Sequence, residues 1–217
     1  MPEINLITLT QPSSPAAEAF RTLRTNLMFS SVEKPVTAML VTSSAKADDK
    51  STAVANLAVT FAQSGNSTIL VDADMRRPAQ HEIWGVDNKR GLATMMLEDS
   101  AISSPPLLDT PVEHLKLLTT GDLPTNPADL LSSQRMNEII GVLKARTNYI
   151  IFDSPPVLAA TDAALLGAKI DGVLLVIRAG HTRRDHTTRA RQALERVNVR
   201  VLGAVLTNAR RETSTRY

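Results

Sequence analysis

The chain has 217 residues, of which 43% are hydrophobic, 21% charged and 3% aromatic, and its formal net charge is +2. This is the composition of an ordinary globular protein with an aliphatic core, and no run approaches the ~18 apolar residues of a membrane-spanning helix. The sequence contains no cysteine, which excludes disulfides, thiolate metal sites and cysteine nucleophiles. The first residues also lack the pattern of a secretory signal peptide, so we expect one cytoplasmic domain.

Charge is distributed unevenly along the chain. From Arg178 to the C-terminus there are ten arginines and three acidic residues, a local charge of +7, whereas the other 14 basic and 19 acidic residues sum to −5. The simplest interpretation is a solvated, arginine-rich helix face followed by a flexible tail. An anionic membrane surface is an alternative partner. Nucleic acid is not expected, because no aromatic residues are interleaved with the arginines.

In chain order, residues 1–14 are expected to form an extended lead-in. Ser14 and Pro15 combine an N-cap with a first-turn proline and predict a helix over Ala16–Phe29. Further helices are predicted over Thr52–Ser64, Gly91–Leu97, Asn126–Arg146, Thr161–Ala168 and Thr182–Val197. Strands are predicted over Val36–Val41, Thr68–Asp72, Leu115–Thr119, Tyr149–Phe152, Gly172–Ile177 and Val201–Leu206. An irregular region is expected from Arg76 to Gly85.

The alternation of these elements predicts the fold class. Near-continuous apolar strands separated by helices are typical of a doubly wound, mainly parallel sheet with helices on both faces. We therefore expect one α/β domain over residues 15–208, followed by a flexible tail over 209–217. Its organising unit is the first strand, loop, helix and second strand, because such a βαβ unit places a phosphate-binding loop at a helix N-terminus.

The loop of this unit departs from the usual pattern. A phosphate-binding loop reads G-x-x-x-x-G-K-[ST], whereas this one reads S-A-K-A-D-D-K-S over residues 44–51. Lys50 and Ser51 supply the expected lysine and hydroxyl, but every glycine is missing. The sequence therefore keeps the side chains that would contact phosphate and metal, and changes the backbone that would cradle them.

Three aspartates stand where predicted strands end: Asp72, Asp74 and Asp153. In a doubly wound sheet the carboxyl ends of the strands face one crevice, which also contains the start of the helix after the loop. Mg²⁺ in such sites takes oxygen ligands from one or two carboxylates, a hydroxyl and phosphate. Together with Lys50 and Ser51, the three aspartates indicate a nucleotide site.

In the first helix, Glu18, Arg21 and Arg24 recur every three residues. Charges with this spacing could reach across to a second copy of the helix. The spacing alone is more typical of a solvated helix face.

Over Ser14 to Asn208 the chain resembles the cytoplasmic domain of bacterial tyrosine kinases of the capsule and exopolysaccharide type. The segments that carry the resemblance are S-P-A-A-E-A-F-R-T-L-R-T-N, the loop ending in K-S-T, I-L-V-D-A-D-M-R-R-P, Y-I-I-F-D-S-P-P-V and G-V-L-L-V-I-R-A-G. The resemblance implies a P-loop fold related to MinD and ParA, with ATP or ADP and Mg²⁺ as cofactors. It also implies tyrosine autophosphorylation in the tail, regulation of polysaccharide synthesis and export, and a separate membrane-bound activator that recruits the chain to the membrane.

The resemblance also assigns roles to residues. Nucleotide contacts are implied for Ala47, Asp48, Asp49, Lys50, Ser51, Thr52 and Asn208. Metal ligands are implied at Ser51, Asp74 and Asp153, and catalytic roles at Lys50, Asp72 and Asp74. Glu18, Arg21 and Arg24 match the family motif E-x-x-R-x-x-R, which mediates ring-shaped self-association, and this match reverses the interpretation from spacing alone. Tyr217 is the implied phosphoacceptor, since Tyr149 lies in a predicted buried strand.

Two departures from the family bear on activity. The family clusters several tyrosines in its tail, and this chain has Tyr217 alone. The loop positions that are glycine in the family are Ala45, Ala47 and Asp49 here. A Cβ in a left-handed conformation costs ~1–2 kcal/mol. A carboxylate ~5 Å from a phosphate charge adds ~3 kcal/mol of repulsion at an effective dielectric constant of ~20.

Three hypotheses follow from these observations. The first is an ATP-dependent protein-tyrosine kinase, and the second is a catalytically impaired scaffold of the same polysaccharide system. The third is a positioning ATPase of the MinD/ParA group. The third hypothesis is the weakest, because the signature lysine of that group lies five residues before the loop lysine, where this chain has Ala45.

Overall fold

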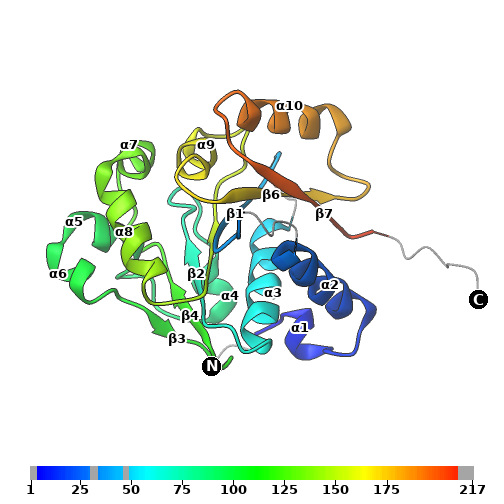
Figure 1. Cartoon of the computed structure of the whole chain (residues 1–217), viewed down its shortest axis with the longest axis horizontal. Helices are drawn as coiled ribbons and strands as arrows, with labels where there is room; N and C mark the ends of the chain where they lie inside the picture. The colour runs from blue at the N-terminus through cyan, green and yellow to red at the C-terminus, as the bar shows by residue number, and fades with distance from the viewer. Residues whose placement is uncertain (1–3, 30–33, 46–48, 210–217) are drawn as a thin grey trace, which may run out of the picture.

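A computed structural model describes residues 4–29, 34–45 and 49–209. The strands of this described part form one seven-stranded sheet in the order β3-β4-β2-β5-β1-β6-β7 (Figure 1). Every pair of neighbouring strands is parallel except β3 and β4. The predicted doubly wound, mainly parallel sheet is therefore confirmed.

The strands and helices have the following bounds. The strands are β1 (Ala38–Ser43), β2 (Thr68–Asp72), β3 (Leu108–Asp109), β4 (Leu115–Leu118), β5 (Tyr149–Asp153), β6 (Gly172–Arg178) and β7 (Val201–Thr207). The helices are α1 (Ile7–Thr10), α2 (Pro15–Phe29), α3 (Lys50–Gln63), α4 (Gln80–Trp84), α5 (Leu92–Leu97), α6 (Asp99–Ser103), α7 (Pro127–Ser132), α8 (Gln134–Lys144), α9 (Asp162–Gly167) and α10 (Arg184–Glu195).

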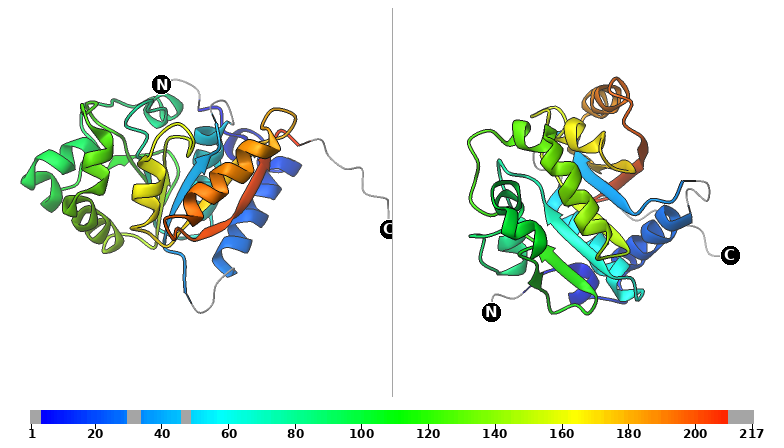
Figure 2. Two further views of the ribbon diagram at one scale, coloured as in Figure 1. Left: turned by 90° about the horizontal axis from the view of Figure 1, so that it is seen from above. Right: turned by 60° about the vertical axis from the view of Figure 1, so that its left-hand side comes forward.

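The sheet lies between two helical layers, which Figure 2 shows on either side of the strands. Successive residues of a strand point to opposite faces, so Leu40 of β1 packs beneath α8 and α9 while its neighbour Met39 packs beneath α3. Both faces of the central strands are therefore apolar and buried, as a parallel sheet requires.

Helix α3 is buried along almost its whole length between the sheet and α2. Half of its apolar residues are small, with alanine at 53, 55, 58 and 62. These small side chains allow the helix to lie close to the strands. The helix that begins at the loop lysine is therefore held rigidly by the core, which fixes the position of Lys50 at its N-terminus.

Two expectations for the irregular regions are wrong. The lead-in is not extended over Ile7–Thr10, which form α1, and both the N–H and the hydroxyl of Thr8 donate to the side-chain oxygen of Asn56 in α3 (3.0 and 2.9 Å). The region from Arg76 to Gly85 contains the short helix α4. That helix ends at Gly85 in the left-handed conformation (φ 63°), which favours glycine.

Other differences concern boundaries and short elements. The first strand covers Ala38–Ser43 rather than Val36–Val41. The predicted helix over Asn126–Arg146 is divided into α7 and α8 by Ser133, whose backbone is extended (φ −63°, ψ 161°). The two-residue strand β3 and the helix α6 were not predicted, because each is too short to show a hydrophobic period. In the part of the chain that the structure describes, no helix is long and apolar enough to cross a membrane.

Candidate nucleotide and metal site

The carboxyl ends of β2 and β5 bring the predicted aspartates together. Asp72 is the last residue of β2 and Asp153 the last of β5, and the two stand side by side in the register of the sheet. Both are fully buried, and Asp74, two residues beyond β2, is only 6% exposed. The three aspartates therefore lie at the same edge of the sheet, as the ends of the predicted strands indicate, and of the three only Asp74 has exposed surface.

Lys50 reaches the same carboxylates from the first turn of α3. Its ammonium forms an ion pair with Asp153 and lies 3.9 Å from an oxygen of Asp74. It also donates a hydrogen bond to the hydroxyl of Ser51 (3.1 Å). The lysine is 7% exposed, so its charge interacts with the aspartates in a poorly solvated environment, where such interactions are strong.

The cluster contains more negative than positive charge. Asp72 accepts hydrogen bonds from the N–H groups of Asp74, Ala79 and Gln80 (3.1, 3.0 and 2.9 Å). Burial and then the neighbouring charge of Asp153 nevertheless raise the pKa of Asp72 to about 7. Burial also raises the pKa of Asp74. Three carboxylates facing one lysine form a site that a further cation would stabilise.

Gln80 is a site residue that the sequence analysis missed. Its side-chain N–H₂ donates to Asp153 (2.7 Å) and to the backbone carbonyl of Ser51 (3.0 Å). Its side-chain oxygen is buried and has no hydrogen-bond partner within the described structure. A buried acceptor without a donor is uncommon and costly. Through its two donated hydrogen bonds, Gln80 links the carboxylate of Asp153 to the first turn of α3.

Arg76 is a second residue that sequence reasoning did not single out. Its guanidinium makes two parallel hydrogen bonds, both 2.9 Å long, to the buried carboxylate of Asp162 at the start of α9. The pKa of Arg76 is raised, mainly by this hydrogen bond. The pair ties the segment after β2, in which Asp74 accepts hydrogen bonds from the N–H groups of Arg76 and Arg77, to the segment after β5. The R-R-P sequence after Asp74 was the available signal, although it does not reveal the partner.

A cavity of about 380 Å³ opens beside the cluster. It is lined by side chains from the loop, from the first turn of α3 and from the segment between Asp74 and α4, including Lys50, Ser51, Asp74 and Arg77. Among the described residues, no three His, Cys, Asp or Glu side chains are placed to hold a metal ion by themselves. The Ser51 hydroxyl and the Asp74 carboxylate that line the cavity are oxygen donors of the kind that Mg²⁺ uses together with phosphate oxygens and water.

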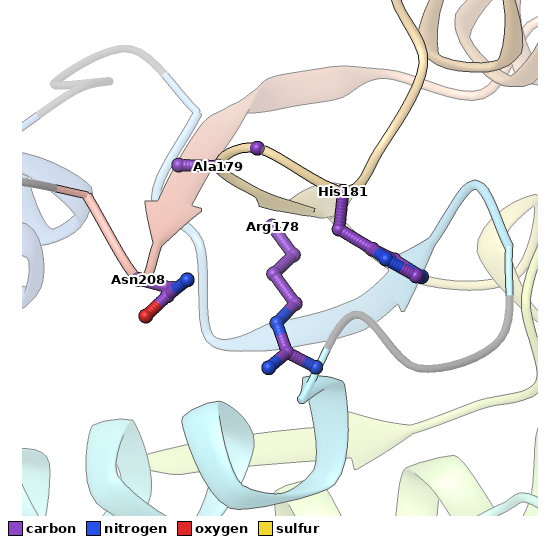
Figure 3. A pocket seen from close by; sticks show the side chains of 5 residues that line it. Arg178, Ala179, His181 and Asn208 are labelled. Atoms are coloured by element: carbon purple, nitrogen blue, oxygen red, sulfur yellow. The ribbon is translucent and has the colours of Figure 1, made fainter.

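The remaining predicted nucleotide contacts are placed as follows. Asp49 precedes α3 with a left-handed backbone (φ 53°). Thr52 is exposed in the first turn of α3. Asn208, just after β7, lines a second cavity of about 710 Å³ together with Arg178 and His181 (Figure 3). Ala47, Asp48 and the predicted phosphoacceptor Tyr217 lie outside the described residues.

The predicted association motif lies on α2. Glu18 and Arg21 form an ion pair of 2.8 Å within the helix, and Arg21 also donates to the carbonyl of Pro12 (2.6 Å). Arg24 points inward instead and donates to the carbonyl of Thr60 in α3 (3.0 Å). The three charges therefore do not share one outward-facing surface in this conformation. Glu18 is exposed, whereas the two arginines are partly covered.

Comparison with known proteins identifies the family. The tyrosine-protein kinase YwqD of Bacillus subtilis is 38% identical to the chain over 98% of the chain and 90% of its own length. The chain belongs to the bacterial tyrosine-protein kinases. A family model described as an AAA domain also matches residues 47–196.

Two solved structures of similar proteins support this assignment. The chimerical protein CapA2B2 has 36% identity and a TM-score of 0.88, covering 93% of this chain and 88% of that one. The kinase domain of the Escherichia coli tyrosine kinase ETK has 29% identity and a TM-score of 0.90, covering all of this chain and 85% of that one. A MinD protein complexed with Mg-ADP from Pyrococcus horikoshii, at 21% identity and a TM-score of 0.66, shares the fold alone. These findings favour the kinase family over the positioning-ATPase hypothesis.

Proposed function

We propose that the chain is an ATP-dependent protein-tyrosine kinase that acts in exopolysaccharide or capsule synthesis and phosphorylates a tyrosine in its own C-terminal tail. The observation that carries the proposal is the buried cluster of Lys50, Asp74 and Asp153 beside Ser51. It combines a cation for phosphate with oxygen ligands for Mg²⁺ in a crevice from which water is largely excluded. A scaffold that had lost nucleotide binding would have no need to retain so costly a group of buried charges.

Each side chain would have a separate task. Lys50 would leave Asp153 and contact the phosphates of ATP, while Ser51 and Asp153 would hold Mg²⁺, which neutralises phosphate charge when bound. Asp74 lines the cavity and would accept the proton of the tyrosine hydroxyl. Its raised pKa suits that role, because a base works best when its pKa approaches the working pH. Asp72 is fully buried and holds the Asp74 segment through its backbone N–H bonds.

A combined binding and phosphorylation experiment tests this proposal. Calorimetry with Mg²⁺-ADP should show binding to the natural chain and none to Lys50→Met. Mass spectrometry after incubation with ATP and a membrane-bound activator fragment should find phosphate on Tyr217, and Tyr217→Phe should remove it. Phosphate on Tyr149 would contradict the assignment, since that ring packs against Phe61 with centroids 4.6 Å apart. Binding without phosphorylation would favour the scaffold hypothesis.

Assembly through α2 is a separate part of the proposal, supported by the match of Glu18, Arg21 and Arg24 to the family motif. A second copy would have to exchange the internal Glu18–Arg21 pair for reciprocal pairs across a two-subunit contact. Arg21→Glu is the cleaner probe, because Arg24 also contacts α3. Arg21→Glu should give monomers in light scattering with the activator fragment present, whereas the exposed control Arg189→Glu should not. A natural chain that stays monomeric at high concentration would argue against ring assembly.

A further inference from the structure

Asp49, which stands where a phosphate-binding loop usually has glycine, contacts Arg178 at the end of strand β6. The Asp49 carboxylate lies 3.3 Å from Nε of Arg178 and accepts a hydrogen bond from its Nη1 (3.4 Å). Asp49 lines the cavity beside Lys50, whereas Arg178 lines the cavity that contains Asn208. The pair therefore stands where the two cavities approach each other, and Figure 3 shows the Arg178 side chain pointing toward the N-terminal end of α3.

Asp49 is held in an arrangement that it would not adopt from local preference. It precedes the first residue of α3 as the N-cap, a position where an aspartate side chain usually turns back to accept from the exposed N–H groups of the first turn. Its side chain makes no such capping bond, and its backbone is left-handed (φ 53°, ψ 27°). This conformation is best suited to glycine and is tolerated by aspartate at some cost.

Arg178 is well placed to impose this arrangement. It is the last residue of β6, and its backbone N–H donates to the hydroxyl of Thr182 (2.8 Å) while its carbonyl accepts from the N–H of the same residue (2.9 Å). Strand β6 lies beside β1, the strand that leads into the loop. The guanidinium therefore projects from a fixed turn over the start of α3, and its contact with Asp49 is set by the sheet.

We propose that Arg178 is a positioning residue of the nucleotide site, which keeps the Asp49 carboxylate away from the first-turn N–H groups of α3. The inference rests on the proposed function. Without the arginine, Asp49 relaxes to the extended conformation of an ordinary N-cap and its carboxylate occupies the place of a phosphate. With the arginine, Asp49 keeps the left-handed backbone conformation that glycine would otherwise supply, and the first-turn N–H groups of α3 stay available to an anion.

The test is a double-mutant cycle on the full chain, with Mg²⁺-ADP as the titrated ligand. Arg178→Gln should weaken binding about tenfold, since a self-capping carboxylate both competes with and repels phosphate. In an Asp49→Gly background, where no carboxylate is present, the same change should weaken binding less than about threefold. Asp49→Gly alone should also change affinity by less than about threefold. The matched control is Arg189→Gln, which removes an exposed arginine of α10 and should leave binding unchanged.

Stability measurements separate positioning from a merely structural role. Arg178→Gln should leave the melting temperature unchanged or raise it, because the freed aspartate caps α3, while nucleotide affinity falls. Equal losses of affinity in both backgrounds would mean that Arg178 contacts phosphate directly or acts only through its charge, and the inference would be wrong. If Asp49→Gly binds and the natural chain does not, the inference also fails while the site stands. If neither protein binds, the proposed function fails.

Discussion

The aspartates at the two ends of the central strands differ in how well their negative charge is compensated. Asp171 lies at the amino end, just before β6, and accepts bonds from the N–H groups of Thr37 and Ala38, from the Thr37 hydroxyl and from Lys144. At the carboxyl end, Asp72, Asp74 and Asp153 share one lysine. The charge of Asp171 is compensated by hydrogen-bond donors and a lysine, whereas the three carboxylates at the other end have only one lysine among them.

The pKa directions express this difference. Burial raises the pKa of Asp171, but hydrogen bonds from Ala38, Lys144 and Thr37 more than offset burial and leave the pKa lowered. Burial and Asp153 instead raise the pKa of Asp72 to about 7, despite three backbone N–H bonds. A lowered pKa means that the charge of Asp171 stabilises the fold, whereas a raised pKa means that the charge of Asp72 costs stability. Unbalanced charge of this kind is typical of functional sites.

The largest expected effect comes from the unbalanced end. Asp153→Asn should reduce Mg²⁺-dependent nucleotide binding and phosphorylation by about 100-fold or more, since it removes a proposed metal ligand and charge complementarity at the reacting group. The free energy of unfolding should change by less than about 1 kcal/mol, because Lys50 keeps Asp74 as a partner and one like charge is relieved. Calorimetry and urea unfolding on the same protein provide both numbers. A large loss of stability with intact nucleotide binding would mean that Asp153 serves the fold and not the site, which would contradict the contrast with Asp171.

The balanced end should behave in the opposite way. Asp171→Ala leaves the buried N–H of Ala38 and the N–H of Thr37 without their acceptor, and we expect a loss of about 2–3 kcal/mol in the free energy of unfolding. Nucleotide affinity measured below the unfolding transition should stay within about twofold of the natural chain. Asp122→Ala, at a position exposed to solvent, is the control for removing an aspartate. A drop in affinity for Asp171→Ala would show that the two ends are coupled.

These two ends also differ in how far they could be predicted. The meeting of Asp72, Asp74 and Asp153 follows from a general rule, because parallel strands end at the same edge of a sheet. The place of Lys50 and Ser51 in the same site follows from the lysine-hydroxyl pair that a phosphate-binding loop has at the start of its helix. The network around Asp171 was not predicted, because an aspartate before a strand has no distinctive spacing.

The partners of the site residues were equally out of reach. Asp49 and Arg178 are 129 residues apart, Gln80 and Asp153 are 73 apart, and Arg76 and Asp162 are 86 apart. Each contact depends on strand order and on the direction of a side chain, which a single sequence does not give. The repulsion expected between Asp49 and phosphate was calculated without Arg178, so we now expect a smaller gain from Asp49→Gly than charge alone would predict. The absence of glycine at position 49 is therefore an incomplete guide to how this loop interacts with phosphate, because it leaves out the partner Arg178.

The raised pKa of Asp72 gives a pH prediction of intermediate size. Between its ordinary pKa and about 7 the folded state binds a proton that the unfolded state has released, so stability is present at low pH and is lost as pH rises. The charged groups that face Asp72 are Lys50 and Asp153, and the raised pKa of Asp74 acts in the same direction. Without nucleotide, the free energy of unfolding should fall by on the order of 2 kcal/mol from pH 5 to pH 8.

Urea unfolding at both pH values, without added Mg²⁺, measures this difference. Asp153→Asn removes the neighbouring charge and should reduce the fall. Asp171→Ala should not reduce it, because the pKa of Asp171 is already lowered. A natural chain whose stability is flat or rising between pH 5 and pH 8 would contradict the view that the carboxyl-end charges are unbalanced.

The smallest expected effect concerns Gln80, the neutral member of the unbalanced end. Gln80→Leu removes a donor that orients Asp153 together with an acceptor that has no partner in the described structure. The buried carboxylate of Asp153 and the carbonyl of Ser51 lose this donor, so we expect a loss of about 1–2 kcal/mol in the free energy of unfolding, which removal of the unpartnered oxygen partly offsets. Binding of Mg²⁺-ADP should weaken about tenfold, because groups that orient metal ligands typically contribute 10–100-fold to affinity.

The control for Gln80→Leu is Gln134→Leu, at a surface position at the start of α8. Titration of ADP at several Mg²⁺ concentrations distinguishes a metal effect from a phosphate effect. If Gln80 serves the metal, the loss should shrink as Mg²⁺ approaches saturation. A loss that is independent of Mg²⁺ would mean that the side-chain oxygen of Gln80 serves the nucleotide itself. An unchanged affinity at every Mg²⁺ concentration would leave Gln80 as part of the core and restrict the site to its charged residues.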